Sequence, residues 1–435
     1  MQSNTSSEKS NGFVHRLTNW AFYPWLVWTL GAAFFCAEYF GRLAPSVMVN
    51  ELMQTFQVDA LGLGALSACF YVAYLAMQLP VGMLVDRFGA HRLLTLTASI
   101  CGMSCLLFGW ANSLWMAEFS RFLMGLGGAF AFVGTLKLAT IWFPANRFGL
   151  LAGATQALGM LGAAIGEGPV SLAVSVIGWR ASMLWMGVVL IVIALLIWAL
   201  VKDHPNQTIQ NHTRLNSMSE ILPGLKTVLR NPQTWSVSIF AALIYAPTGA
   251  FGELWGVTYL EHVQHLSHHV AAGAISMVFL GWGIGGPLSG WISDRIGRRK
   301  PNLIISAFGS LLTLTTVLYW PNLSSHWVYL ALFLYGVMNT GLVTAYALSG
   351  EINRQETAGI SMAFTNMCSV LLAFFFQPLA GFLLNAQWTG VLQAGVKQYT
   401  EQAYQWAMLP LPCCLFLALL GCVCIKETYC QRVDQ

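Results

Sequence analysis

The sequence predicts an all-α membrane protein in which about twelve transmembrane helices form two six-helix halves. Three observations lead to this fold class. Of the 435 residues, 56% are hydrophobic and only 9% are charged, whereas soluble domains carry roughly a quarter charged residues. The apolar residues fall into runs of about 20, the length that crosses a bilayer as a helix. One charged motif also occurs twice, 208 positions apart, which indicates that one half of the chain repeats the other.

Each crossing is expected to be a helix because a backbone surrounded by lipid must satisfy its own hydrogen bonds. In the first half the predicted spans cover residues 22–46, 62–84, 91–110, 114–138, 147–172 and 181–201. In the second half they cover residues 234–259, 270–293, 301–320, 327–348, 357–384 and 404–425. We therefore expect a first domain at 1–201, a cytoplasmic linker at 202–233 and a second domain at 234–435. Apolar residues at helical spacing within 221–229 predict a short helix in the linker.

The repeated motif reads G-x-x-x-D-R-x-G and is followed by basic residues. Each copy lies between two apolar runs, so it predicts a short charged hairpin between two membrane helices. Its glycines allow close approach and a tight turn, its aspartate can face the positive end of a helix, and its arginines favour the cytoplasmic side. We expect a gating role for Gly82, Asp86, Arg87, Gly89, Arg92, Gly290, Asp294, Arg295, Gly297 and Arg298.

Lysine and arginine residues are distributed unevenly between the two sets of loops. With the N-terminus inside, the outer loops hold only Arg180 and Lys397, and all other loop cations lie on the inner side. Because short cytoplasmic loops carry an excess of positive residues, both termini are predicted to be cytoplasmic. We expect a multi-pass protein of the bacterial cytoplasmic membrane.

The motif resembles the signature loop of the major facilitator superfamily, which joins the second and third helices and recurs between the eighth and ninth. The matching duplication extends the resemblance over nearly the whole chain. The resemblance implies a secondary transporter with a central site between two halves and alternating access to the two sides of the membrane. No G-x-x-x-x-G-K-[ST] loop occurs, which disfavours an ATP-driven pump. No catalytic constellation stands out either, so no enzymatic activity is expected.

Charged residues inside the spans are candidates for function because each costs about 2.5–3.5 kcal/mol at the bilayer centre. Seven such residues occur, and counting along each span places all except Lys137 in one layer, in the outer third of the membrane. Two interpretations stay open. The spacings of Glu38 to Arg42 and of Glu118 to Arg121 allow each pair to neutralise itself on one helix face. Alternatively, a buried carboxylate without a partner takes up a proton and couples proton flow to transport. The seven residues are Glu38, Arg42, Glu118, Arg121, Lys137, Glu167 and Glu253.

Two of the arginines match superfamily patterns. Arg121 begins an R-x-x-x-G-x-G pattern in the fourth helix, and the resemblance implies a part in coupling, for which Glu118 and Glu167 are further candidates. Arg42 lies where transporters of organic anions and organophosphates carry a substrate-binding arginine. Span 7 has no second arginine, which disfavours a phosphate substrate. Lys137 can bind substrate or extend to the headgroups. The expected substrate-binding residues are Arg42, Glu38, Tyr39, Lys137, Glu253, Tyr245, Trp282 and Tyr346.

Three stretches, at residues 39–49, 78–82 and 254–260, resemble the phagosomal transporter branch, which serves amino-acid and nucleoside uptake. Related proteins import siderophores. A zwitterion suits a site that holds both Arg42 and a glutamate, so the predicted function is import of an amino acid by proton symport. The alternatives are import of a polycarboxylate siderophore, export of a drug or metabolite, and a nontransporting sensor. The expected partners of this monomer are the lipid bilayer, a small-molecule substrate and protons; no nucleic acid, metal ion or cofactor is expected.

Overall fold

A computed structural model of the chain describes residues 22–144, 147–203, 217–393 and 396–431. The first group of elements comprises α2 (Tyr23–Leu43), the 3-10 helix η1 (Ala44–Val47), α3 (Val49–Phe56), α4 (Ala60–Met77), α5 (Pro80–Phe88), α6 (Ala90–Gly109), α7 (Leu114–Gly128), α8 (Ala131–Trp142) and α9 (Phe148–Leu200). The second group comprises α11 (Pro232–Pro247), the π-helix η4 (Thr248–Trp255), α12 (Gly256–Val263), α13 (His268–Ile296), α14 (Lys300–Tyr319), α15 (Ser325–Met338), α16 (Gly341–Glu351), α17 (Ala358–Ala386), β1 (Leu392–Gln393), β2 (Val396–Lys397), α18 (Glu401–Met408) and α19 (Pro410–Gly421).

The prediction of an all-helical membrane fold is confirmed. Among the described residues, ten helices are long and apolar enough to cross a bilayer. One of them, α9, has 53 residues and contains two crossings, because Gly178 interrupts it with a φ of 81°. Helix α2 has 21 residues and is not among these ten; it contains tyrosines, tryptophans, Glu38 and Arg42. Counting α9 twice and adding α2 gives the twelve crossings expected from the sequence.

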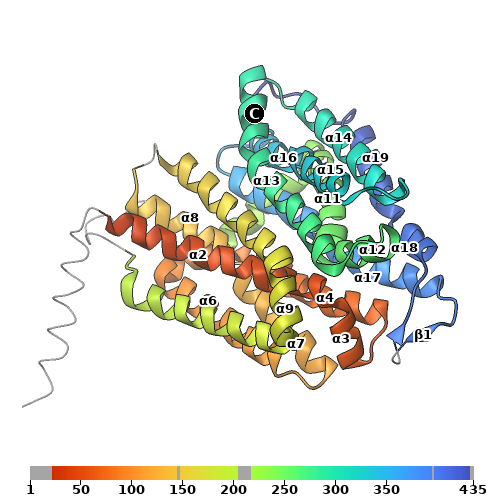
Figure 1. The fold of residues 1–435 in the computed structure, drawn as a ribbon. Coiled ribbons are helices and arrows are strands. Elements are labelled where there is room, and N and C mark those ends of the chain that lie inside the picture. Colours follow the sequence, from red (N-terminus) through yellow and green to blue (C-terminus); the bar gives the residue numbers. More distant parts are fainter. Residues whose placement is uncertain (1–21, 145–146, 204–216, 394–395, 432–435) are drawn as a thin grey trace, which may run out of the picture.

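The helices form two groups that meet at one end of the molecule and diverge toward the other (Figure 1). Between the groups, α9 packs against α13 and α4 packs against α17. Helix α9 ends at Leu200 and helix α11 begins at Pro232, and both positions lie beside the predicted domain boundaries. The division into domains itself stays a prediction. Helix α10 (Ser217–Arg230) lies where the short linker helix was predicted.

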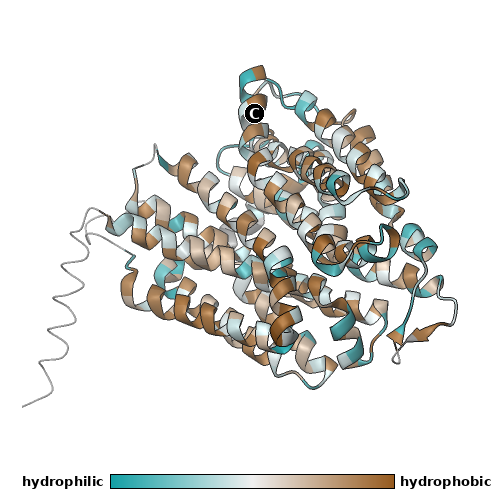
Figure 2. Ribbon diagram, viewed as in Figure 1, coloured by the Kyte–Doolittle hydropathy of each residue, from teal (hydrophilic) through white to brown (hydrophobic). Residues whose placement is uncertain are grey.

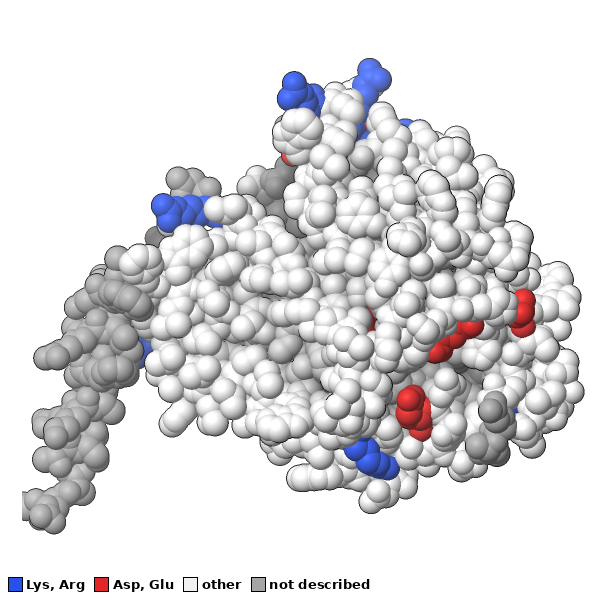
Figure 3. All heavy atoms as spheres, viewed as in Figure 1, with Lys and Arg blue, Asp and Glu red and all other residues white. Residues whose placement is uncertain are grey.

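The surface follows the expectation for a protein surrounded by lipid. Apolar residues dominate the flanks of the helices, and polar residues gather at helix ends and loops (Figure 2). On the face shown in Figure 3, several lysine and arginine side chains lie at the diverging end, whereas acidic side chains gather at the end where the groups meet, together with a basic one. We call the meeting end the outer end, following the predicted orientation, and the diverging end the inner end.

Candidate functional site

A buried ion pair joins the two groups of helices. Arg42, in the last turn of α2, contacts Glu253 of η4, and the shortest distance, from Nη2 to Oε1, is 2.9 Å. Its Nε also donates to Oε2 at 3.3 Å. Tyr245 completes a triangle, since its hydroxyl accepts from Arg42 Nη2 at 2.8 Å and donates to Glu253 Oε1 at 2.6 Å. Arg42 is 4% exposed and Glu253 2%, so this contact is made away from water.

Aromatic rings surround the guanidinium of Arg42. The rings of Tyr39, Phe70, Tyr71 and Tyr74 have their centroids 5.2–5.6 Å from its central carbon. Tyr39 comes from α2 and the other three from one stretch of α4. Rings at this distance attract a cation through their π-electrons.

Arg121 has a different environment, although it is as deeply buried as Arg42. Its Nη1 donates to the carbonyl of Gly41 at 2.8 Å and its Nη2 donates to the carbonyl of Arg42 at 3.0 Å. These carbonyls belong to the last turn of α2, where a helix leaves acceptors without intrahelical partners. Arg121 therefore holds the end of α2 and, through it, the backbone of Arg42.

Glu38 lies one helical turn before Arg42 and is 4% exposed. Its Oε1 is buried and has no hydrogen-bond partner among the described residues. Helix α7 approaches so closely that a side chain at Gly128 would place its Cβ 2.6 Å from this oxygen. A small void beside the carboxyl is lined by Gly41, Phe70, Cys101, Cys105, Met124 and Leu190. An apolar, tightly packed surrounding of this kind favours a neutral carboxyl group over a charged one.

Two further carboxylates of the predicted layer have separate surroundings. Glu167 on α9 is fully buried; its Oε1 accepts from the hydroxyl of Ser46 at 2.7 Å, and its Oε2 has no partner among the described residues. Glu118 on α7 is half-buried and forms no ion pair with any described residue.

The interpretation in which the arginines pair within their own helices is wrong. In the described part of the chain no ion pair joins Glu38 to Arg42 or Glu118 to Arg121. Arg42 turns to the other group of helices, where Glu253 offers two oxygens, and Arg121 is occupied by backbone carbonyls. The layer consequently holds carboxylates that no cation neutralises.

The other residues predicted to bind substrate lie at varying distances from this cluster. The ring centroid of Trp282 is 6.4 Å from that of Tyr245, and its Nε1 is buried without a partner in the described structure. The hydroxyl of Tyr346 donates to Asn366 at 2.7 Å. Lys137 instead contacts Asp86 at 2.6 Å, so its role in binding substrate stays a prediction.

The two copies of the repeated motif form charged turns at the inner end. Gly89 ends α5 and Gly297 ends α13, with φ values of 86° and 68° that favour glycine. In the first copy Asp86 contacts Lys137 of α8. In the second copy Arg299 bridges Asp294 at 2.6 Å and Glu351 of α16 at 2.7 Å. Each copy is thus tied by an ion pair to a helix of its own group.

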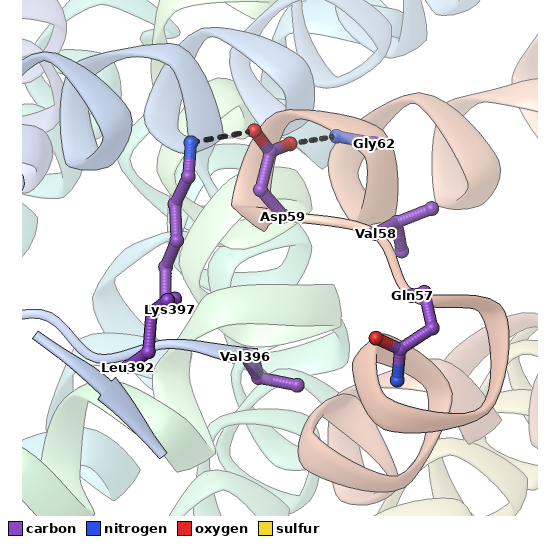
Figure 4. Close-up of a pocket in the computed structure, with 7 residues that line it drawn as sticks. All are labelled: Gln57, Val58, Asp59, Gly62, Leu392, Val396 and Lys397. Atoms are coloured by element: carbon purple, nitrogen blue, oxygen red, sulfur yellow. Dashed lines mark hydrogen bonds and ion pairs between the residues drawn. The ribbon is translucent and has the colours of Figure 1, made fainter. Parts of the chain in front are cut away.

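At the outer end, a second set of contacts joins the groups and lines a pocket of about 360 Å³ (Figure 4). Lys397 of β2 contacts Asp59, which caps α4 through the N–H of Gly62 at 3.0 Å; the ion pair also measures 3.0 Å. Burial raises the pKa of Asp59, but the bonds from Gly62 and Lys397 outweigh it and hold the pKa below its usual range. The hydroxyl of Tyr399 accepts from the N–H of Ala60. We call these contacts the outer latch.

The sequence reasoning missed the aromatic residues of α4 and the residue Gln377 of α17. Tyr71 and Tyr74 carry no charge, and tyrosines in an apolar span are common, so no pattern marked them. Gln377 is 1% exposed, a rare environment for a glutamine in a membrane helix. A glutamine within a predicted span is visible in the sequence, and its amide is costly to bury in the same way as the charged side chains that were selected as candidates.

A family model described as "Major Facilitator Superfamily" matches residues 25–378. The chain is 27% identical to membrane sensor protein UhpC of Escherichia coli (84% of this chain, 86% of the relative). It is 26% identical to the probable sulfoacetate transporter SauU of Cupriavidus necator (61% and 64%) and to the probable galactarate/D-glucarate transporter GudP of Escherichia coli (76% and 80%).

The fold is also similar to solved structures. A bacterial homolog of the human lysosomal transporter Spinster, in an inward-facing and unoccupied conformation, superposes with a TM-score of 0.77 at 14% identity, covering 94% of this chain and 98% of that one. This similarity shows the fold alone. Together with the family model, which spans most of the sequence, it confirms the fold expected from the repeated motif. The chain belongs to the major facilitator superfamily, a family of multi-pass membrane transporters and not of enzymes.

Proposed function

We propose that this chain imports a small organic solute with a carboxylate or similar anionic group, together with a proton, across a bacterial cytoplasmic membrane. The observation that carries the proposal is the buried contact of Arg42 with Glu253 beside the unpaired carboxyl of Glu38. An arginine fork binds a planar anion through two parallel bonds. In the empty carrier Glu253 occupies that fork, and an entering substrate takes its place.

The charges around Arg42 suggest how a proton is taken up with the substrate. With Glu38 neutral, the cluster of Arg42, Arg121 and Glu253 has a net charge of +1, and one bound anion neutralises it. With Glu38 ionised, the cluster is already neutral, and the same anion would leave a buried negative charge. Because an uncompensated buried charge is costly, anion binding favours protonated Glu38. One anionic charge and one proton then move together.

The number of charges around Arg42 also limits the class of substrate. A phosphate dianion would meet one available arginine beside two glutamates, because Nη1 and Nη2 of Arg121 bond to backbone carbonyls. A single carboxylate or sulfonate group at Arg42 fits better. The names of SauU and GudP point to organic acids, but sulfoacetate and glucarate carry two anionic groups each, so the charge count favours a solute with one such group over them. An amino acid offers the required carboxylate, and its ammonium can pair with a glutamate. Membership of the phagosomal transporter branch is a finer hypothesis about the family of the chain. A siderophore is a finer hypothesis about its substrate.

Uptake into vesicles tests the proposal. Purified protein in proteoliposomes is offered a panel of labelled solutes: alanine, D-glucarate, sulfoacetate and glucose 6-phosphate. We expect a carboxylate- or sulfonate-bearing solute to accumulate under an inward proton gradient and to leave when an uncoupler is added. Accumulation that needs no proton gradient, or accumulation of the phosphate ester alone, would contradict the proposal.

A nontransporting sensor is the second candidate, and the similarity to UhpC, whose printed name is membrane sensor protein, favours it. Binding and accumulation separate the two functions. A sensor raises its melting temperature with its ligand, because a ligand that binds only the folded state stabilises it, yet it accumulates none of that ligand. A carrier shows the ligand-induced rise in melting temperature and also accumulates the ligand.

A further inference from the structure

Glu253 reaches Arg42 from an unusual piece of backbone. It lies in η4 (Thr248–Trp255), which is π-helical and in which every residue is buried. In a π-helix each N–H bonds to the carbonyl five residues earlier, and such segments are rare and frequent at functional sites. A return of η4 to α-helical geometry would change the direction of the Glu253 side chain. The position of Glu253 at Arg42 therefore depends on what holds η4 in this form.

A single residue of α17, Gln377, contacts η4 near both of its ends. Its side-chain Nε2 donates to the carbonyl of Gly249 at 2.8 Å, and its backbone carbonyl accepts from Trp255 Nε1 at 3.0 Å. The two helices touch so closely here that a Cβ at position 249 would lie 2.2 Å from Cβ of Ala373. Glu253 lies between the two contacted residues in the sequence.

The same residue also contacts the group of helices that carries Arg42. Nε2 of Gln377 lies 3.4 Å from the hydroxyl of Tyr71, whose ring is one of those around the guanidinium. The backbone of Gln377 lies against α4, because a Cβ at Gly64 would be 2.6 Å from its carbonyl oxygen. Gln377 thus contacts both sides of the Arg42–Glu253 pair from within the seam between α4 and α17.

We propose that Gln377 is a positioning residue that makes the Arg42–Glu253 pair depend on closure of the outer seam. While α17 lies on α4, Gln377 holds η4 so that Glu253 occupies Arg42. When the outer end opens and α17 moves away from α4, the hold on η4 changes and Glu253 leaves the arginine. Arg42 is then free on the side from which substrate arrives. The proposal deepens the proposed function, since it rests on Arg42 as the substrate-binding residue.

A double-mutant cycle on the distance between the groups tests the proposal without any substrate. Spin labels are placed at Val176 and Val391, which are 81% and 55% exposed, in a background where the exposed Cys413 and Cys424 are serine. Distance distributions are then measured for the parent protein, Gln377→Met, Glu253→Gln and the double variant. Each single substitution is expected to increase the long-distance, outer-open population several-fold. The double variant should open no further than Glu253→Gln alone, because the two residues act through one pair.

Gln78→Met is the matched control. Gln78 also joins the groups, since its Oε1 accepts from Asn366 Nδ2 at 2.6 Å, but among the described contacts it has none with η4. The increase in the outer-open population caused by Gln78→Met should add to the increase caused by Glu253→Gln. If the effects of Gln377→Met and Glu253→Gln also add, Gln377 is only a packing residue and the proposal is wrong. Gln377→Asn, whose shorter amide no longer reaches Gly249, gives the same test if the methionine variant does not fold. Unchanged substrate affinity in Arg42→Lys would contradict the proposed function but would leave the result of the double-mutant cycle as it is, so the two failures are distinguishable.

Discussion

Arg42 and Glu253 are 211 positions apart in the sequence, yet their side chains meet at 2.9 Å and are almost fully buried. Breaking a buried ion pair by removing one partner typically costs roughly 3–5 kcal/mol, because the other charge is left uncompensated. The contact therefore stabilises the arrangement in which the two groups of helices are closed at this level. It also means that any substrate bound by Arg42 must first replace Glu253.

The first prediction concerns the anion-binding group. Arg42→Lys keeps the charge but loses the planar fork that matches a carboxylate, so affinity for the transported anion should fall at least tenfold, about 1.4 kcal/mol. Ligand-dependent thermal shift measures it. Arg180→Lys is the control, because Arg180 bonds to the carbonyls of Gly109 and Ala111 at the outer end. Equal affinity of Arg42→Lys and the parent would remove Arg42 from the binding site.

The second prediction concerns Glu253 as a competitor of the substrate. Glu253→Gln should lower the melting temperature of the empty protein, because Arg42 loses its partner. Bound anion should then raise the melting temperature by more than in the parent, because it replaces the missing carboxylate without competition. Melting curves with and without the anion identified in the panel measure both effects. A smaller ligand-induced rise than in the parent would contradict the competition.

The third prediction concerns the inner turns. Asp86→Asn and Lys137→Met should each slow transport to a similar degree and leave equilibrium affinity unchanged, because the 2.6 Å contact between them lies at the inner end and not beside Arg42. Asp294→Asn should act likewise through its contact with Arg299. Transport rates and dissociation constants are compared for each variant. A tenfold loss of affinity in any of them would assign that residue to the substrate site.

The fourth prediction concerns the outer latch and pH. Since the pKa of Asp59 lies below its usual value of 3.8, the ionised form that bonds to Lys397 persists above that value, and its contribution is lost only as pH falls below it. Lowering the pH from about 8 to about 5 should therefore leave the latch intact. Asp59→Asn, which can still cap α4, should increase the outer-open population, and Lys397→Met, which leaves the Asp59 cap in place, should increase it to a similar degree. Spin-label distances at the outer end measure both; an outer-open population unchanged in Lys397→Met would show that the ion pair does not hold the seam.

The sequence predicted which charged residues stay inside the membrane, but of the two interpretations left open for them, pairing within one helix is wrong. Helical spacing reports only neighbours on one helix, so it suggested Glu38 as the partner of Arg42. The real partner comes from the other half of the chain, and only the packing of α2 against η4 brings them together. The spans and the repeated turns were predictable because hydropathy and the G-x-x-x-D-R-x-G motif are local properties.

Other features had no local signal. The π-helical segment η4 contacts α17, and the sequence of span 7 offers only Pro247 and three glycines as hints of irregularity. The latch joins Asp59 to Lys397 across 338 positions. Lys397 was nevertheless visible as an exception to the positive-inside distribution, and its contact with Asp59 supplies a physical reason for a lysine on the predicted outer side.

The most direct test of proton-coupled import is the behaviour of Glu38→Gln in proteoliposomes. The substitution removes the titratable group beside Arg42 but keeps its size and leaves Arg42, Glu253 and Tyr245 in place. Glu401→Gln is the control, because Glu401 is exposed at the start of α18 and its ionic contact is with His265. We predict that Glu38→Gln no longer concentrates substrate under an inward proton gradient and still exchanges internal for external substrate, since exchange needs no net proton movement. Accumulation by Glu38→Gln equal to that of the control would contradict the account.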